Sequence, residues 1–496
     1  MIIKILSILF LVVCSKFGFS QLSKIDTIAV AKVYMASKEY EEAGLLLKLY
    51  QQDNYNDLEA NWLYALLLSY QGENSKSIKF FENALQVSPD NQQVKFDFAK
   101  SLFYSANLEA ANEILLEIKN NKEDQAEVMY MLAYISYWQF DFKEVKRRIK
   151  EFETAFPESN RLHDLKIELE LATSPVLNIG IEYQTDNQPL NYFNQEIEFG
   201  SHITNMLNPK FKFSNYFLSN SQHIYEYNLN NSFVFGKKGF SINLGAGVYK
   251  NFNDKSNWIG QAELEKKIFQ KLTLKVGYIK SAYFSTIASS TVNLTQNNAF
   301  TIIEYKNPKL MTINALYNYQ FFDDNNNIQT FGLWILSKDF RINKVAFQLG
   351  YGYNYSNSKY NNFTSKVPLS TIILDIDAYN PIEGKYSPYF TPQKQSVSSG
   401  LFIIKYNPTK KISAEIKANI ALVASHFNPY LYVDTNMIGD YKLKRSFAKT
   451  EFFPFEISAK FGYNISNSIK INLVYFYQET YYFYRNNISF NVNYIF

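Results

Sequence analysis

Four histidines are the side chains in this sequence best suited to acid–base or metal chemistry. They are His163, His202, His223 and His426. No two of them stand in a His-x-x-x-His or His-Glu-x-x-His spacing, and no acidic cluster flanks them. The sequence therefore predicts no metal site and no cofactor. It also contains no Gly-x-Ser-x-Gly motif and no glycine-rich phosphate loop.

A serine–histidine esterase is the one enzymatic alternative that these histidines leave open, because such an enzyme needs only a serine beside a histidine base. His223 has Ser219 and Ser221 close by in the sequence. His426 directly follows Ser425. Polar loop residues explain both neighbourhoods more simply, so we expect that the protein is not an enzyme.

Charged side chains also recur at every second position of several segments. In KISAEIKANI (Lys411 to Ile420), apolar residues share one side of an extended chain, and Glu415 and Lys417 share the other. In a closed membrane barrel such a polar side lines the lumen. The candidate lumen-facing residues are Glu263, Glu265, Lys275, Glu415, Lys417 and Lys470. Because their signs are mixed, the sequence predicts neither cation nor anion selectivity.

The long segment Ser356 to Gln395 is the best functional candidate outside the regular segments. Its stretch LSTIILDIDAY, with three prolines soon after it, is too apolar for a fully solvated loop. One interpretation is a constriction loop that folds into a lumen. The candidate constriction residues are Leu369, Asp375, Asp377 and Tyr379. The alternative, equally favoured, is that the segment extends an outer hairpin or packs on a neighbouring loop.

The elements that would position these residues are β-strands over residues 176–496. Segments of about 8 to 13 residues alternate apolar and polar side chains and are separated by turn signals. Short connections such as NPTK (Asn407 to Lys410) and NISN (Asn464 to Asn467) alternate with longer ones, among them Ser425 to Thr450. This pattern predicts an antiparallel transmembrane β-barrel of about 16 strands, with both of its ends on the same side of the membrane.

The last residues of the chain add a separate signal. Phe490, Val492, Tyr494 and Phe496 alternate up to a terminal aromatic residue. Final strands of this kind are recognised by the barrel assembly machinery. We therefore expect that machinery and outer-membrane lipid to be partners of the protein.

The first third of the chain contains a 34-residue repeat. Blocks begin at Lys24, Leu58, Gln92 and Ala126. A small residue occupies the eighth position of each block, and the twentieth position is small in most: Ala31, Ala65, Ala99 and Ala133, then Ala43, Ser77, Ala111 and Val145. Large apolar residues fill the twenty-fourth: Leu47, Phe81, Leu115 and Ile149. Such spacing lets paired antiparallel helices pack closely and stack.

These positions resemble the tetratricopeptide repeat over Lys24 to Ser159, followed by a polar capping helix near Arg161 to Leu171. Only Gly72 conforms at the turn between the two helices, where a glycine is common. Its equivalents are Lys38, Ala106 and Phe140. We expect the large aromatic residues of the repeats to be core: Trp62, Trp138, Phe81 and Phe98. The surface of such a solenoid predicts an unknown periplasmic protein or polysaccharide as partner.

The N-terminus reads as a secretory signal over residues 1–20. Lys4 provides the positive charge, Ile5 to Val13 the apolar core, and Gly18-Phe19-Ser20 a small-x-small cleavage site. Cys14 is the only cysteine, so cleavage after Ser20 would leave no thiol chemistry. The predicted organisation is thus a signal peptide at 1–20, an all-α tetratricopeptide-repeat solenoid at 22–173 and a barrel at 176–496, in an α + β multidomain chain.

Composition agrees with this organisation and excludes other classes. The chain has 496 residues and a formal net charge of +4, with 19% charged and 17% aromatic residues. Ordinary soluble domains contain about 25% charged residues. Without a clustered basic face, the sequence predicts no nucleic-acid partner.

The order of signal peptide, tetratricopeptide repeats and C-terminal barrel is similar to that of the YaiO family of outer membrane proteins. The resemblance covers nearly the whole chain by architecture and rests on no catalytic motif. It implies a place in the outer membrane with the repeats in the periplasm, and a role beside envelope polysaccharide export.

Three functions remain open from the sequence. We favour a porin-like pore or export component. The first alternative is a barrel-anchored docking protein that recruits periplasmic partners. The second is an outer-membrane lipid- or glycan-modifying enzyme.

Overall fold

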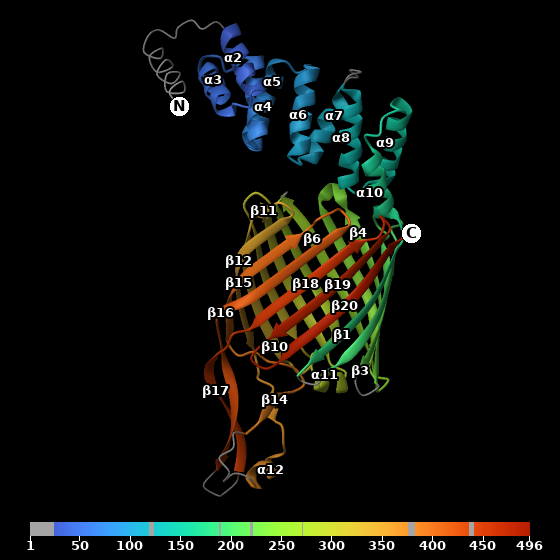
Figure 1. Ribbon diagram of the computed structural model, residues 1–496, viewed down its shortest axis with the longest axis vertical. Helices are drawn as coiled ribbons and strands as arrows, with labels where there is room; N and C mark the ends of the chain where they lie inside the picture. The colour runs from blue at the N-terminus through green and yellow to red at the C-terminus, as the bar shows by residue number, and fades with distance from the viewer. Residues whose placement is uncertain are drawn as a thin grey trace, which may run out of the picture. The chain divides into compact units, whose positions relative to one another are not determined.

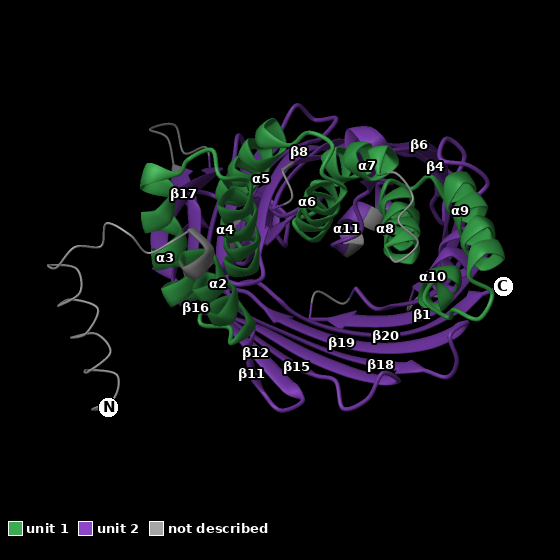
Figure 2. Cartoon of the chain, turned by 90° about the horizontal axis from the view of Figure 1, so that it is seen from above, with its two compact units in different colours: residues 1–166 green, residues 167–496 purple. Residues whose placement is uncertain are grey.

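The computed structural model describes residues 24–118, 124–187, 190–218, 222–269, 271–374, 382–435 and 441–496. The predicted signal peptide and Cys14 lie outside these residues. The chain forms two compact units, residues 1–166 and 167–496 (Figure 2). The division after residue 166 falls within the helix His163–Thr173. The predicted boundary, residues 174–175, lies directly after the end of that helix.

The first unit consists of antiparallel helix pairs. The helices are α2 (Lys24–Ala36), α3 (Tyr40–Asp53), α4 (Leu58–Gln71), α5 (Asn74–Val87), α6 (Gln92–Tyr104), α7 (Leu108–Glu117), α8 (Gln125–Trp138), α9 (Phe142–Ala155) and α10 (His163–Thr173). Figure 2 shows α4, α6 and α8 as one layer and α5, α7 and α9 as the other. No described helix is both long enough and apolar enough to cross a membrane.

The repeat register explains the packing of these helices. Ala31, Ala65, Ala99 and Ala133 have no exposed surface, and the twentieth-position residues are equally buried. The large residues of the twenty-fourth position fill the spaces between the pairs. Phe81, for example, is 0% exposed and stacks on Phe98 with ring centroids 5.0 Å apart. The predicted tetratricopeptide-type solenoid is confirmed.

The four turns within the repeats share one backbone conformation despite their different residues. Lys38, Gly72, Ala106 and Phe140 have φ of 62°, 79°, 58° and 58°. At Ala106 the amide donates to the Phe103 carbonyl at 3.0 Å, and the Asn107 amide donates to the Leu102 carbonyl at 2.9 Å. This is the helix-ending pattern that usually takes glycine. The missing glycines therefore leave the turn geometry unchanged but put three side chains in the left-handed region.

Ala106→Gly is expected to stabilise the repeat unit by about 1 kcal/mol, because the exposed methyl group packs little and the left-handed backbone costs an L-residue about 1–2 kcal/mol. Urea unfolding followed by the helical circular dichroism signal measures the change. Gly72→Ala is the matched control at the equivalent turn, and we expect it to destabilise by a similar amount. Equal stability of all three proteins would contradict this account of the turns.

The second unit is a closed antiparallel barrel (Figure 1). Its strands are β1 (Val176–Asp186), β2 (Tyr192–Gly200), β3 (Pro209–Leu218), β4 (His223–Phe235), β5 (Phe240–Lys250), β6 (Ser256–Phe269), β7 (Leu272–Ala282), β8 (Thr295–Asn307), β9 (Met311–Phe321), β10 (Asn327–Ser337), β12 (Val345–Ser358), β15 (Gln395–Tyr406), β16 (Ile412–Thr435), β18 (Phe455–Asn464), β19 (Ile469–Glu479) and β20 (Tyr484–Ile495). The pairing of β1 with β20 closes the ring, and the predicted sixteen-strand barrel is confirmed.

Side chains alternate between the two faces of this wall. Large apolar residues on the outside stay exposed, and examples are Ile181, Phe199, Leu229, Leu264, Ile303, Phe402, Leu473 and Phe490. Their neighbours along each strand point inward and are mostly polar, as at Asn178, Glu182 and Asn491. Apolar outside and polar inside is the pattern of a barrel that crosses a lipid bilayer.

The two ends of the barrel differ in their connections. The end where β1 begins and β20 ends has short connections, such as Asn407 to Lys411 between β15 and β16 and Ile465 to Ser468 between β18 and β19. We call this the turn end. The opposite end, which we call the loop end, includes the helix α11 (Ile287–Thr291) and most of the longer connections.

The predicted loop Ser425 to Thr450 is wrong in its conformation. β16 continues to Thr435 and pairs with β17 (Tyr441–Glu451), so that a regular hairpin extends beyond the loop end (Figure 1). Cross-strand pairing explains this, because alternating residues such as Tyr430 and Tyr432 suit a two-stranded ribbon. The remaining short elements are β11 (Phe340–Ile342), β13 (Phe363–Ser365), α12 (Leu369–Leu374) and β14 (Gly384–Tyr386).

Candidate functional site

The lumen near the loop end is packed with apolar and aromatic side chains. Ile224, Tyr249 and Ile259 point inward from neighbouring strands and are at most 2% exposed. Phe284, from the connection between β7 and β8, packs against Tyr192 with ring centroids 5.1 Å apart, and also against the Tyr216 ring. A barrel of this size normally leaves a water-filled interior. These side chains instead form a small hydrophobic core inside the wall.

A part of the long connection between β12 and β15 covers the same end. We call residues 382–394 the crossing segment. At its centre Tyr389 is 0% exposed and stacks on Phe322, with ring centroids 3.7 Å apart. The Tyr389 hydroxyl donates to the Asp324 carboxylate at 2.7 Å. The Thr286 hydroxyl donates to the Pro388 carbonyl at 2.7 Å. These contacts attach the segment to the β7–β8 and β9–β10 connections.

The crossing segment is attached on the other side as well. The Tyr386 hydroxyl donates to the Tyr482 hydroxyl at 3.2 Å, and the Phe390 and Tyr482 ring centroids are 5.1 Å apart. Tyr482 belongs to the β19–β20 connection. In the strand order, eight strands separate this connection from the β7–β8 connection in either direction around the ring. The segment therefore joins opposite sides of the barrel and passes over the lumen.

His426 belongs to this aromatic attachment and does not contact a serine. Its Nε2 atom lies 3.1 Å from the Tyr482 hydroxyl, and its ring packs against Phe452 and Tyr481. The Ser425 side chain instead contacts Ser396 Oγ at 3.3 Å. Burial lowers the pKa of His426 and raises the pKa of Tyr482, so both are neutral at pH 7.

The other histidines are spread over the molecule. His163 begins α10 and is exposed, His202 contacts the Asn208 side chain, and His223 packs against Phe217 and Tyr225. Ser219 and Ser221 lie outside the described residues. Among the residues that the structure describes, no group of three or more His, Cys, Asp or Glu side chains is arranged to hold a metal ion.

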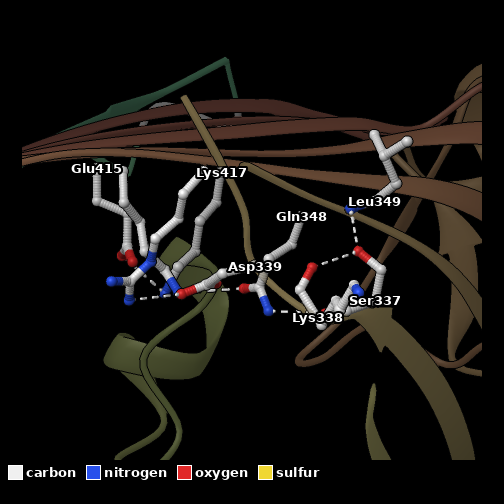
Figure 3. Close-up of polar contacts among 9 residues, drawn as sticks. Ser337, Lys338, Asp339, Gln348, Leu349, Glu415 and Lys417 are labelled. Carbon is white, nitrogen blue, oxygen red and sulfur yellow. Dashed lines mark hydrogen bonds and ion pairs between the residues drawn. The ribbon is translucent and has the colours of Figure 1, made fainter. Parts of the chain in front are cut away.

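The lumen near the turn end contains charged side chains in networks. The Lys405 ammonium donates to Gln348 Oε1 at 3.1 Å and lies 3.4 Å from the Asp339 carboxylate. Figure 3 labels Asp339 and Gln348 of this network. Gln348 in turn donates to the Ser337 carbonyl at 2.9 Å. These contacts connect the turn between β10 and β12 to the barrel wall. They also hold the charged groups of Lys405 and Asp339 in place at this end of the lumen.

The predicted lumen residues all lie on the polar face, by register. Glu263 forms an ion pair with Lys275 at 2.8 Å, and Glu265 is the cross-strand partner of Lys275. Glu415 forms an ion pair with Lys417 at 2.9 Å. Lys470 lies on the wall formed by β18 and β19. The structure thus brings these residues together as two separate groups, on different parts of the ring.

Of the predicted constriction residues, only Leu369 belongs to the described part of the chain. Leu369 lies in α12, which contacts β17 of the outer hairpin. Asp375, Asp377 and Tyr379 lie outside the described residues. The crossing segment follows them in the chain. It lies within the predicted functional segment Ser356 to Gln395 and contains two of the prolines noted there, at 388 and 392. The aromatic pair Tyr389-Phe390 is the signal that the sequence analysis missed.

The predicted C-terminal signal residues lie on the last strand. Phe490, Val492 and Tyr494 pair across with β1, and the exposed rings of Phe490 and Tyr494 belong to the outer face of the barrel. The Phe496 amide donates to the Pro175 carbonyl at 3.0 Å, which joins the two ends of the barrel sequence.

The repeat unit has an exposed aromatic row. Tyr70, Tyr104 and Trp138 are spaced by 34 residues and stand at or next to the ends of α4, α6 and α8. Their exposed fractions are 61%, 68% and 43%, so the prediction that Trp138 is core is wrong. Trp138 packs against Phe103 and Tyr134, with ring centroids 5.1 Å and 5.6 Å away, and keeps the rest of its surface exposed. The row is therefore available for contact with a partner.

A buried polar pair joins the same layer of helices. The Trp62 indole nitrogen donates to the Asp97 carboxylate at 3.0 Å, between α4 and α6. Burial raises the pKa of Asp97, although this hydrogen bond opposes the shift. A carboxyl whose folded-state pKa is raised stabilises the fold fully below its unfolded pKa. It loses that contribution as pH rises through the folded value.

Asp97→Asn is therefore expected to stabilise the repeat unit at pH 7, since asparagine keeps an acceptor for Trp62 and carries no charge. The stability difference from the wild type should shrink as pH falls below the pKa of Asp97. Urea unfolding at pH 4 and pH 7 measures it. A variant that is less stable than the wild type at pH 7 would show that the charge itself is favourable there.

Comparisons with known proteins find similar solved structures but no relative in sequence. No protein-family model matches the chain, and no curated relative matches it. A structure described as a bacterial polysaccharide outer membrane secretin is similar at 9% identity and TM-score 0.49, over 65% of this chain and 99% of that chain. CdiB from Acinetobacter baumannii is similar at 8% identity and TM-score 0.37, over 65% of this chain and 60% of that chain.

The helical unit is similar to a tetratricopeptide repeat protein from Parabacteroides merdae, at 14% identity and TM-score 0.29, over 31% of this chain and 60% of that chain. The class defined by the chain's own fold is a helical-repeat unit followed by a closed sixteen-strand antiparallel β-barrel. The resemblance to the YaiO family stays a prediction.

Proposed function

We propose that this protein is a gated export component of the outer membrane, whose barrel provides a passage and whose repeats recruit a periplasmic partner. The observation that carries the proposal is the contrast between the two ends of the lumen. Charged side chains such as Lys460 and Lys470 are exposed near the turn end, whereas apolar packing and the crossing segment cover the loop end. A lumen that is polar at one end and covered at the other is what we expect of a channel with a closed gate.

The location in the outer membrane follows from the wall of the barrel. Its outer face is apolar and its inner face is polar, and all strand edges are closed by pairing. Both properties suit lipid on the outside and water on the inside. Lipid and the barrel assembly machinery are then the partners of the barrel, the latter through Phe490 to Phe496.

The periplasmic position of the repeats is proposed from connectivity. An even number of strands puts the start of β1 and the end of β20 at the turn end. Short turns face the periplasm in barrels of this type. Because the repeats directly precede β1, they would leave the barrel on that side. The exposed row Tyr70, Tyr104 and Trp138 is the face offered to a periplasmic protein or polysaccharide.

Permeation measures the proposed function. Full-length protein in liposomes should admit neutral oligosaccharides slowly, and a variant with residues 382–394 replaced by a short Gly–Ser linker should admit them many times faster. A variant with the same replacement of residues 436–440, which follow β16 in the sequence, is the control and should behave like the wild type. If replacing the crossing segment leaves the barrel impermeable, the export function fails.

The covered loop end also favours a second candidate, a docking protein whose barrel is only an anchor. If the protein is a docking protein, the barrel should stay impermeable after residues 382–394 are replaced. The repeats should still bind their partner. We propose no enzymatic activity. An enzyme that used His426 would lose a lipid- or glycan-modifying activity in His426→Gln, without loss of assembly.

A further inference from the structure

The turn end of the lumen contains a hollow in the wall formed by β15, β16, β18 and β19. Its volume is about 220 Å³, which is room for about seven waters at about 30 Å³ each. The lining residues are Lys405, Asn407, Ser413, Ala414, Glu415, Lys460 and Lys470. Through Lys405 it adjoins the network that contains Asp339 and Gln348, both labelled in Figure 3.

The hollow carries positive charge that the protein does not neutralise. Lys405 is paired with Asp339 at 3.4 Å, and Glu415 is paired with Lys417 at 2.9 Å. Within the described residues, Lys460 and Lys470 form no ion pair with an acidic side chain. Glu415 is the cross-strand neighbour of Lys460 but is paired with Lys417, so the lining keeps an excess of positive charge at Lys460 and Lys470.

The inner face of β1 to β8, on the other side of the barrel, is rich in negative charge. The strand register puts these glutamates on the inner face of β1 to β8: Glu182, Glu196, Glu198, Glu226, Glu263, Glu265 and Glu304. Lys210, Lys212 and Lys275 pair with Glu198, Glu196 and Glu263. Within the described residues, the remaining four glutamates of this set form no ion pair and leave the wall with an excess of negative charge. An anionic group in the lumen is thus repelled from the β1–β8 side and attracted to the hollow.

We propose that this hollow binds an anionic group, a carboxylate or a phosphate, carried by the solute that enters the barrel at the turn end. Lys460 and Lys470 provide the charge, and the Ser413 hydroxyl and Asn407 amide are available as hydrogen-bonding groups. The inference deepens the proposed export function and rests on it, because it names the chemical class of solute that the passage would prefer.

Binding to the full-length protein in nanodiscs tests the proposal, with triglucuronate as the carboxylate probe, glucose 1-phosphate as the phosphate probe and maltotriose as the neutral probe. We expect titration calorimetry to detect at least one anionic probe and not maltotriose. The double variant Lys460→Gln/Lys470→Gln should weaken that binding by about tenfold or more, since it removes both charges that the hollow offers to an anion. Which anionic probe binds distinguishes carboxylate from phosphate.

Two controls keep the result interpretable. Lys442→Gln removes an exposed cation from β17, outside the barrel, and should leave the affinity unchanged. Glu415→Gln removes the acidic member of the lining and should strengthen binding by a few fold. Resistance of the folded barrel to unfolding in detergent, read from its gel mobility, verifies that each variant is folded.

Equal affinity of the double variant and the wild type, or equal binding of maltotriose and the anionic probes, would overturn the proposal. Its failure is distinguishable from failure of the export function. Permeation without anion binding would contradict only the proposed anion site. Anion binding without permeation would contradict only the proposed export function.

Discussion

Tyr389→Ala is expected to turn a nearly silent barrel into a conducting one in planar bilayers. Tyr389 is fully buried, stacks on Phe322 and donates a hydrogen bond to Asp324. Removing a buried aromatic side chain costs about 3–5 kcal/mol, and here it removes both contacts of Tyr389 with the β9–β10 connection. We expect single-channel openings that are at least tenfold more frequent than in the wild type.

Tyr389→Phe is the matched control for this experiment. It keeps the ring stack and loses only the hydrogen bond to Asp324, so we expect it to stay mostly closed. A wild type that conducts as freely as Tyr389→Ala would mean that the crossing segment does not close the barrel. An alanine variant that stays silent while its gel mobility shows a folded barrel would mean that Tyr389 does not control the closure and that the packed core beneath the segment is enough to close the lumen.

Phe81→Ala should destabilise the repeat unit by about 3–5 kcal/mol, because Phe81 is fully buried and stacks on Phe98. Since a typical domain is stable by only about 5–15 kcal/mol, much of the folded population is lost on mild heating. The helical circular dichroism signal should therefore melt at lower temperature, while the strand signal of the barrel stays unchanged.

The control for this substitution is Tyr55→Ala, at a residue that is 72% exposed in a turn. Its melting temperature should equal that of the wild type within error. If Phe81→Ala and Tyr55→Ala melt alike, the twenty-fourth position does not form the core of the repeats.

Much of this architecture was predictable because it depends on short-range periodicity. Ala65 and Ala99 lie 34 residues apart, and packing of helix pairs demands a small residue at both. Alternation at Ile412 to Ile420 similarly indicates which side of a strand meets lipid and which meets water. Even the turns that lack glycine keep their place, because the helices around them fix the backbone of Lys38, Ala106 and Phe140.

The closed loop end was not predictable in the same way. Tyr389 stacks on Phe322, and the neighbouring Pro388 carbonyl accepts a hydrogen bond from Thr286. Both partners are far away in the sequence, and loops have no period that reveals such contacts. The apolar stretch after Pro368 attracted attention because of its hydrophobicity, yet α12 contacts the outer hairpin. Trp138 was assigned to the core because tryptophan is usually buried, and its exposure depends on how neighbouring repeats stack.

The measurement that tests the central claim most directly is cysteine accessibility in intact Gram-negative cells. In a Cys14→Ser background, single cysteines replace Val292 at the loop end, Ile465 at the turn end and Tyr55 in the repeats, all exposed residues. A membrane-impermeant maleimide should label Val292→Cys in intact cells, and the other two only after the outer membrane is permeabilised. Labelling of Tyr55→Cys or Ile465→Cys in intact cells, or of none of the three before permeabilisation, would contradict an outer-membrane barrel with periplasmic repeats.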